Sequence, residues 1–155
     1  MTSIKFNQQP VKLVLEDQDI SQMIYSNDSA EKFIELINDY LSNETRRSQG
    51  NLLIVQLSES EEIEAVVTID NIVDVINSIQ ESTNHTTVAD YNLARSAKPS
   101  KLTLIKDSED IGELVKVFSL ISSGVIAVTN ESNQYVGKVT RSKLLEKLNV
   151  VAENN

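Results

Sequence analysis

Apolar positions in the first half of the chain switch between helical spacing and short continuous runs. Residues 30–37 carry apolar side chains at helical spacing, which predicts an amphipathic helix with Ser29 as its N-cap. Those side chains are Ala30, Phe33, Ile34 and Ile37. The runs 52–55 and 63–67 are short and rich in β-branched residues, which is typical of buried strands. The polar stretch 58–62 between them predicts a turn.

A further helix is predicted to start near Asp70 and to turn one apolar face toward the core. That face consists of Ile72, Val73, Ile76 and Ile79. The same pattern recurs 72 residues later, where Thr140 takes the place of Thr68. The matched positions are Ile54 with Ile126, Glu59 with Glu131, Val67 with Val139, and Ile72, Val73 and Ile76 with Leu144, Leu145 and Leu148. A repeat at one fixed offset indicates two copies of a single supersecondary unit.

The second copy contains the same kinds of element in the same order. Its predicted strands are 102–105, 125–128 and 135–139, and its predicted helices are 111–120 and 142–148. The first of these helices is expected to turn three side chains inward, namely Leu114, Val115 and Phe118. The sequence therefore predicts an α/β (α+β) fold of two βαββα copies, packed sheet to sheet with pseudo-two-fold symmetry.

The regions outside the two copies are more polar. The first copy is nine residues longer than the second, and the extra residues fall in the polar loop 41–50. A weak strand at 11–15 is expected to cover a sheet edge. The predicted divisions are an N-terminal segment 1–20, a first copy 21–80, a linker 81–99, a second copy 100–150 and a tail 151–155.

Composition excludes several classes of function. The net charge of −9 argues against nucleic-acid binding, which needs clustered Lys and Arg. With no cysteine and the single histidine His85, the chain lacks the residues for a thiolate or histidine metal site and for a catalytic dyad. No apolar run reaches the ~20 residues of a membrane span, and the N-terminus lacks the apolar stretch of a secretory signal. We expect a cytoplasmic protein that is not an enzyme, holds no metal and does not insert into membranes.

The residues around the two threonines resemble a known motif. Residues 123–145 look like the second half of a CBS motif, in which Gly-x-x-Thr/Ser-x-x-Asp/Asn opens the final helix. Gly137–Lys143 matches this pattern except for lysine at the last position, and Ala65–Asn71 matches except for alanine in place of glycine. The chain thus resembles a tandem CBS pair, or Bateman module, over about residues 20–150.

A threonine at a strand-to-helix junction has a physical reason to contact a ligand. The first N–H groups of a helix lack intrahelical partners, and they attract phosphate oxygens. An amide or acid three residues after the threonine lies one turn later on the same face, where it can hydrogen-bond a ribose. The alternative is that Thr68 and Thr140 serve only as helix N-caps.

The resemblance implies an adenine-containing ligand in a cleft between the two motifs. Thr68 with Asn71 is the better candidate, whereas Lys143 replaces the usual ribose acceptor of the second motif. Lys143 and Arg141 favour either a more highly phosphorylated ligand or plain solvation as exposed cations. The predicted ligand-binding residues are Thr68, Asn71, Lys101, Thr103, Leu104, Ser123, Val125, Thr140 and Lys143. The candidate ligands are AMP, ADP, ATP, S-adenosylmethionine and cyclic di-AMP.

The function implied by the resemblance is regulatory sensing without a required cofactor. Ligand binding would shift the two halves, and a partner protein such as a transporter or an enzyme would read the shift. Modules of this family usually form homodimers. The second motif also looks like the CBS segments of osmoprotectant ABC-transporter ATPases. The alternative is a ligand-free interaction or dimerisation module, in which side chains fill both clefts.

Overall fold

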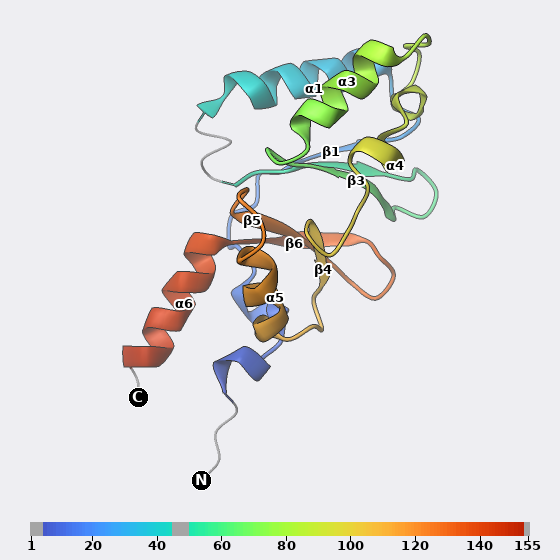
Figure 1. Cartoon of the computed structure of the whole chain (residues 1–155). Coiled ribbons are helices and arrows are strands. Elements are labelled where there is room, and N and C mark those ends of the chain that lie inside the picture. Colours follow the sequence, from blue (N-terminus) through green and yellow to red (C-terminus); the bar gives the residue numbers. More distant parts are fainter. Residues whose placement is uncertain (1–4, 45–49, 154–155) are drawn as a thin grey trace. The chain divides into compact units, whose positions relative to one another are not determined.

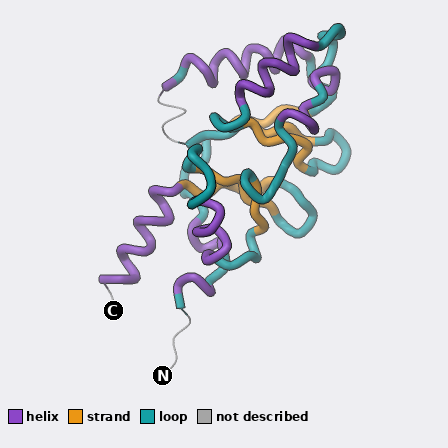
Figure 2. Tube along the Cα trace, in the orientation of Figure 1, coloured by secondary structure: helices purple, strands orange, loops and turns teal. Residues whose placement is uncertain are grey.

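The computed structural model describes residues 5–44 and 50–153, which fall into two compact units. The middle unit comprises residues 20–100, and the terminal unit combines residues before 20 with those from 101 onward. Each unit places helices against a three-stranded sheet (Figures 1 and 2). This mixed arrangement of two similar units confirms the predicted fold class.

The middle unit has a mixed sheet with the order β1-β2-β3. Strands β1 and β2 run parallel, and β2 and β3 run antiparallel. Its elements are β1 (Gln22–Tyr25), α1 (Ala30–Ser42), β2 (Leu53–Gln56), β3 (Ile63–Val67), α3 (Ile72–Glu81), the 3-10 helix η3 (Val88–Tyr91) and α4 (Leu93–Ser96). As predicted, Ser29 caps α1: its hydroxyl accepts a hydrogen bond from the Lys32 N–H at 3.2 Å. Part of the predicted polar loop 41–50, residues 45–49, lies outside the described residues.

Helices α1 and α3 cover one face of this sheet (Figure 1). The predicted inward positions of α1 are buried or packed against the core. The prediction for α3 was wrong at Val73, which is 65% exposed. Ile72 is buried as predicted, Ile76 and Ile79 pack against the core, and Val75 is buried in place of Val73. Positions three and four residues apart share a helix face, and Val73 is rotated away from it.

Two parts of the middle unit differ from the sequence-based reading. Strand β1 was missed because only Ile24 in it is buried, so no apolar run marks it. The segment 81–99, expected to be a linker, contains η3 and α4. Four of its apolar side chains join the core of the middle unit: Val88, Tyr91, Leu93 and Ala97. Polar residues separate these four side chains in the sequence, so no apolar run or helical spacing marked them as core residues.

The terminal unit repeats the topology, with a sheet of order β4-β5-β6. Strands β4 and β5 are parallel, and β5 and β6 are antiparallel. Its elements are the 3-10 helices η1 (Phe6–Gln8) and η2 (Val11–Val14), β4 (Leu104–Lys106), α5 (Ile111–Phe118), β5 (Val125–Thr129), β6 (Tyr135–Thr140) and α6 (Arg141–Glu153). The 72-residue offset extends to burial: Ile72 and Leu144 are buried, whereas Val73 and Leu145 are exposed.

Two predictions for the second copy need correction. Strand β4 begins at Leu104, so Leu102 and Thr103 lie in the preceding turn. Helix α5 ends at Phe118, before the predicted end at 120, and Val115 is exposed while Val117 is buried. A continuous apolar run defines neither where a helix or strand ends nor which of its residues face the core.

The predicted strand at 11–15 is wrong, because these residues form η2. Val11 and Val14 are three residues apart, one 3-10 turn, and both are fully buried in the core of the terminal unit. The Val11 N–H donates to the Glu109 carbonyl at 2.8 Å, and the Lys12 N–H to the Asp107 carbonyl at 3.2 Å. The N-terminal segment is therefore an integral part of the terminal unit.

Truncation of the η2 anchor tests this packing. Val14→Ala is expected to lower the free energy of unfolding by about 2 kcal/mol, because it removes buried methyl groups and leaves a cavity. The neighbouring Leu13→Ala removes more apolar volume from a side chain that is 53% exposed, so it should cost less. Denaturant unfolding measures both variants. Equal losses would contradict the buried position of η2.

Candidate functional site

The first strand-to-helix junction lies between β3 and α3 and contains Thr68 (2% exposed). The Thr68 hydroxyl accepts a hydrogen bond from the Asp70 N–H at 3.2 Å. Because α3 begins at Ile72, Thr68 lies ahead of the helix and is not its N-cap. The hydroxyl instead stabilises the turn that leads into α3.

Asn71 holds this turn together with both ends of its carboxamide. Its Oδ1 accepts from the Thr68 N–H at 2.8 Å, and its Nδ2 donates to the Val66 carbonyl at 2.7 Å. The amide therefore points back toward the strand rather than along the helix, and the Asn71 side chain makes no capping bond to α3. The side chain of the N-cap residue therefore leaves the first-turn N–H groups of α3 without a cap.

The second junction, between β6 and α6, has the opposite arrangement. Thr140 immediately precedes α6, and its hydroxyl accepts from the Lys143 N–H at 3.2 Å, which is the geometry of an N-cap. The same hydroxyl donates to Glu16 Oε2 at 2.6 Å. The capping alternative is therefore confirmed for Thr140, and an acidic residue from the N-terminal segment completes the junction.

Lys143 also pairs with the N-terminal segment. Its Nζ lies 2.9 Å from Asp17 Oδ2. The hydrogen bond that the Lys143 ammonium donates to Asp17 raises the pKa of Lys143, and the same hydrogen bond and the charge of Lys143 lower the pKa of Asp17. The lysine that replaces the expected acid of the motif is thus matched by a carboxylate of this chain.

The second junction has a third side chain of interest, Lys138 on β6, in addition to Thr140 and Lys143. Its side chain is almost fully buried, and its Nζ lies 4.0 Å from Asp19 Oδ1. Burial lowers the pKa of Lys138, while Asp19 and Glu16 oppose that shift. Tyr135 also hydrogen-bonds Asp19 through its hydroxyl. Sequence reasoning missed Lys138 and the acids Glu16, Asp17 and Asp19, although the spacing of three acids in five residues was a visible signal.

Comparison with solved structures identifies the fold that carries these junctions. CBSX2 from Arabidopsis thaliana, solved in complex with AMP, aligns over 92% of this chain and 98% of its own, with a TM-score of 0.59 and 14% identity. A CBS domain pair/ACT domain protein from Thermotoga maritima aligns over 92% and 98%, with a TM-score of 0.57 and 15% identity. The chain has the fold of a tandem CBS-domain pair.

A third similar structure is the cytosolic domain of the Mg²⁺ channel MgtE in complex with ATP. It aligns over 88% of this chain, with a TM-score of 0.52 and 15% identity. This chain spans about half, 51%, of the chain in that structure and nearly all of the chains in the other two. No family model and no curated protein matches the chain. In the CBS fold, the middle unit holds the first motif and the terminal unit holds the second.

The other predicted site residues all belong to the second CBS motif. Thr103 and Lys101 lie in the turn before β4, and Leu104 begins that strand. Ser123 precedes β5, where its hydroxyl donates to the Val125 carbonyl at 3.2 Å. Val125 pairs with Thr140 across β5 and β6. The structure thus brings Ser123 and Val125 to the Thr140 junction, and an approach of any of them to Thr68 stays a prediction.

Arg141 is anchored within the second motif rather than solvated. Its guanidinium donates to the Ile121 carbonyl at 2.9 Å and lies 5.3 Å from the centre of the Phe118 ring. Both contacts hold the side chain against the end of α5. Arg141 therefore stabilises the packing of α6, and its predicted alternative as an exposed cation does not hold.

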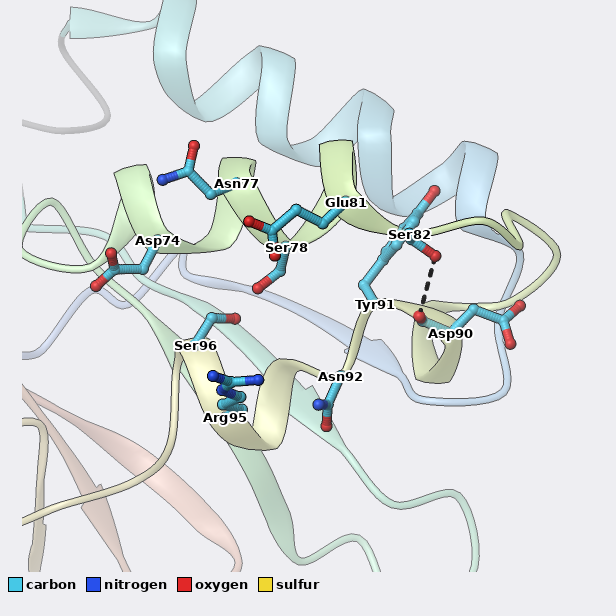
Figure 3. Close-up of a pocket in the computed structure, with 10 residues that line it drawn as sticks. All are labelled: Asp74, Asn77, Ser78, Glu81, Ser82, Asp90, Tyr91, Asn92, Arg95 and Ser96. Carbon is cyan, nitrogen blue, oxygen red and sulfur yellow. Dashed lines mark hydrogen bonds between the residues drawn. The ribbon is translucent and has the colours of Figure 1, made fainter.

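The first motif also contains a polar pocket of about 460 Å³ that the sequence did not indicate (Figure 3). It lies between α3 and the segment of η3 and α4, and it does not include Thr68. The lining residues are Asp74, Asn77, Ser78, Glu81, Ser82, Asp90, Tyr91, Asn92, Arg95 and Ser96. The Ser82 hydroxyl donates to the Asp90 carbonyl at 3.2 Å within it. In the described ranges, no group of three or more His, Cys, Asp or Glu residues could hold a metal ion.

No helix among the described residues is long and apolar enough to cross a membrane. The candidate sites are the two strand-to-helix junctions, each within its own unit. At the first, the N-cap side chain does not cap α3, and at the second, side chains of the chain itself bond Thr140 and Lys143.

Substitution of Asn71 tests the architecture of the first junction. Asn71→Ala is expected to cost about 1–3 kcal/mol of unfolding free energy, because it leaves the Thr68 N–H and the Val66 carbonyl without these partners. The control Asn77→Ala, at an exposed position of the same helix, should cost about 0.5 kcal/mol or less. Chemical denaturation of the two variants gives the comparison, and similar losses would count against the Asn71 clamp.

The Asp17–Lys143 pair predicts a pH-dependent difference in stability. A carboxyl whose pKa is lowered by folding adds stability above its unfolded pKa and loses it as the pH falls through the folded pKa. The stability difference between the wild type and Asp17→Asn should therefore be present at neutral pH and vanish in strong acid. Denaturant unfolding across the acid range measures it. In a Lys143→Gln background the difference should shrink strongly, because only the weaker charge interaction with Lys147 remains, and a difference of undiminished size there would contradict the pairing.

Proposed function

We propose that this chain is a regulatory module that binds an adenine nucleotide at the first CBS motif, beside Thr68. The observation that carries the proposal is the start of α3, whose N-cap side chain turns back to the strand and leaves the first-turn N–H groups without a side-chain cap. Such N–H groups attract phosphate oxygens. Similar folds solved with AMP and with ATP support this ligand class.

The second motif differs from the first in a way that supports assigning the nucleotide to the first motif. There the hydroxyl of Thr140 caps α6 and is bonded to Glu16, and Lys143 is paired with Asp17. A nucleotide at that junction would have to displace these contacts. We therefore assign nucleotide binding to the first motif in the resting protein.

Asn71 has a positioning role in this proposal, with ribose contact as its second task. A carboxamide has two N–H donors and two acceptor lone pairs, and its bonds to Thr68 and Val66 use one of each. One donor and one acceptor remain for a ribose hydroxyl.

A regulatory role requires that the ligand bind one conformation of the protein more tightly than another. We propose that a partner protein, such as a transporter or an enzyme, reads this change, and that the chain works as a cytoplasmic homodimer. The competing function is a ligand-free interaction module. The self-filled second junction favours that alternative, so the ligand test decides between them.

A thermal-shift panel tests the ligand class. AMP, ADP, ATP, S-adenosylmethionine and cyclic di-AMP are each added at millimolar concentration to the full chain. A ligand present at about 100 times its Kd adds about 2.7 kcal/mol to the stability of the folded state, which raises the Tm clearly. We expect at least one adenine nucleotide to do so.

Isosteric variants locate the binding. Thr68→Val should abolish the Tm increase, whereas Thr140→Val should leave it in place. Thr129→Val is the matched control, because its buried hydroxyl has no hydrogen-bond partner among the described residues. If no compound of the panel raises the Tm of the wild type, nucleotide sensing is excluded for these ligands and the interaction module is favoured. Loss of the increase in Thr140→Val alone would move the site to the second motif.

A further inference from the structure

The polar pocket beside α3 lies entirely within the middle unit (Figure 3). One wall is the face of α3 that carries Asp74, Ser78 and Glu81, and the other wall is the segment of η3 and α4. Its volume of about 460 Å³ is within the range of small-molecule sites. The pocket does not include Thr68, so a ligand site here lies beyond the proposed function.

Both walls of this pocket are anchored in the core of the middle unit. On α3, Val75 is fully buried on the face turned to the core. On the opposite wall, Tyr91 and Leu93 are each 2% exposed and belong to the same core. The Ser82 hydroxyl joins the walls, because it donates to the Asp90 carbonyl at 3.2 Å. The shape of the pocket is therefore a property of the folded unit.

Most charged groups of the pocket have no partner within the protein. Among the described residues, nothing forms an ion pair or a side-chain hydrogen bond with the carboxylates of Asp74 and Glu81 or with the guanidinium of Arg95. Asp90 differs, because its carboxylate accepts from the Thr87 N–H at 2.9 Å. The pocket thus has two unpaired carboxylates on the α3 wall and one unpaired guanidinium on the α4 wall.

A buried hydroxyl of the pocket also lacks a partner. The Oγ of Ser96, at the end of α4, is almost fully buried and has no hydrogen-bond partner among the described residues. Figure 3 shows it directed toward α3, on which the Glu81 carboxylate turns back toward Ser78. A buried hydroxyl without a hydrogen bond costs stability. A ligand between the walls would supply the missing partner.

We propose that this pocket binds a basic α-amino acid. The ligand carboxylate pairs with Arg95, whose planar guanidinium matches a carboxylate through two parallel N–H groups. The α-ammonium has three N–H donors, which suit the Glu81 carboxylate and the hydroxyls of Ser78 and Ser96. Asp74 precedes Glu81 by seven residues on the same face of α3, about 10 Å along the helix. It is placed to bind the cationic end of a lysine or arginine side chain.

The balance of charge in the pocket disfavours other small molecules. Two unpaired carboxylates against one guanidinium disfavour acidic amino acids and phosphate esters, because like charges repel. A diamine would pair with both acids but would leave Arg95 without a partner. A neutral amino acid would leave Asp74 without one. The pocket is therefore matched to a molecule with two positive groups and one negative group.

Isothermal titration of the full chain with L-lysine and with L-arginine tests the proposal. At least one of them should bind in a saturable manner. Its decarboxylated counterpart, cadaverine for lysine or agmatine for arginine, should bind at least about tenfold more weakly, because Arg95 then has no partner. L-Glutamate should bind more weakly still.

Variants with exposed side chains assign the contacts. Arg95→Gln should lower the affinity for the amino acid at least about tenfold and leave the affinity for the decarboxylated compound equal or higher. Glu81→Gln should weaken the binding of both compounds. The control Glu35→Gln makes the same charge change at an exposed position of α1, outside the pocket, and both affinities should stay near the wild-type values.

Three results would overturn the proposal. The first is the absence of saturable binding of either amino acid. The second is equal affinity for an amino acid and its decarboxylated counterpart, because the acids alone would then explain the binding. The third is an equal loss of affinity in Glu81→Gln and Glu35→Gln. Failure of nucleotide binding at Thr68 changes none of these readouts, because Thr68 is not part of the pocket.

Discussion

The structure depends on how a buried polar residue is satisfied at each strand-to-helix junction. Thr68 and Thr140 are both buried, and a buried polar group without hydrogen bonds would cost stability. The two copies meet this constraint differently. At the first junction the Asp70 N–H and the Asn71 amide of the same turn supply the contacts. At the second, Glu16 supplies one from more than a hundred residues away in the sequence.

That difference gives the two CBS motifs different chemical characters. The Asn71 clamp fixes the turn without capping α3, so the positive end of this helix keeps its capacity for an anion. The second junction is closed by residues 15–17 of the N-terminal segment. Asp17 pairs with Lys143, Glu16 bonds Thr140, and Leu15 packs against Gly137. A repeat that looks symmetric in sequence thus produces one junction whose helix start has no cap from its N-cap side chain and one that the chain itself fills.

The fold was largely predictable from the sequence, since the apolar runs and helical spacing of both copies are strong signals. Which apolar residues of a helix face the core, by contrast, depends on tertiary packing: Val73 and Val115 both face solvent. The 3-10 helix η2 and the anchors of segment 81–99 were missed because their apolar residues are few and widely spaced. Thr68 and Asn71 were predicted from motif spacing as ligand contacts, and that role stays a prediction. The Glu16 and Asp17 contacts were not predicted, because partners so distant in sequence follow no local pattern.

The central claim is that the first motif, and not the second, is the nucleotide site of the resting protein. Amide proton–nitrogen spectra of the full chain, recorded as AMP is added, test it most directly. The account predicts that the amide signals of residues 69–74, at the start of α3, shift in a saturable manner while those of residues 141–143 stay in place. Shifts confined to residues 141–143, or no saturable shift at residues 69–74, would contradict it.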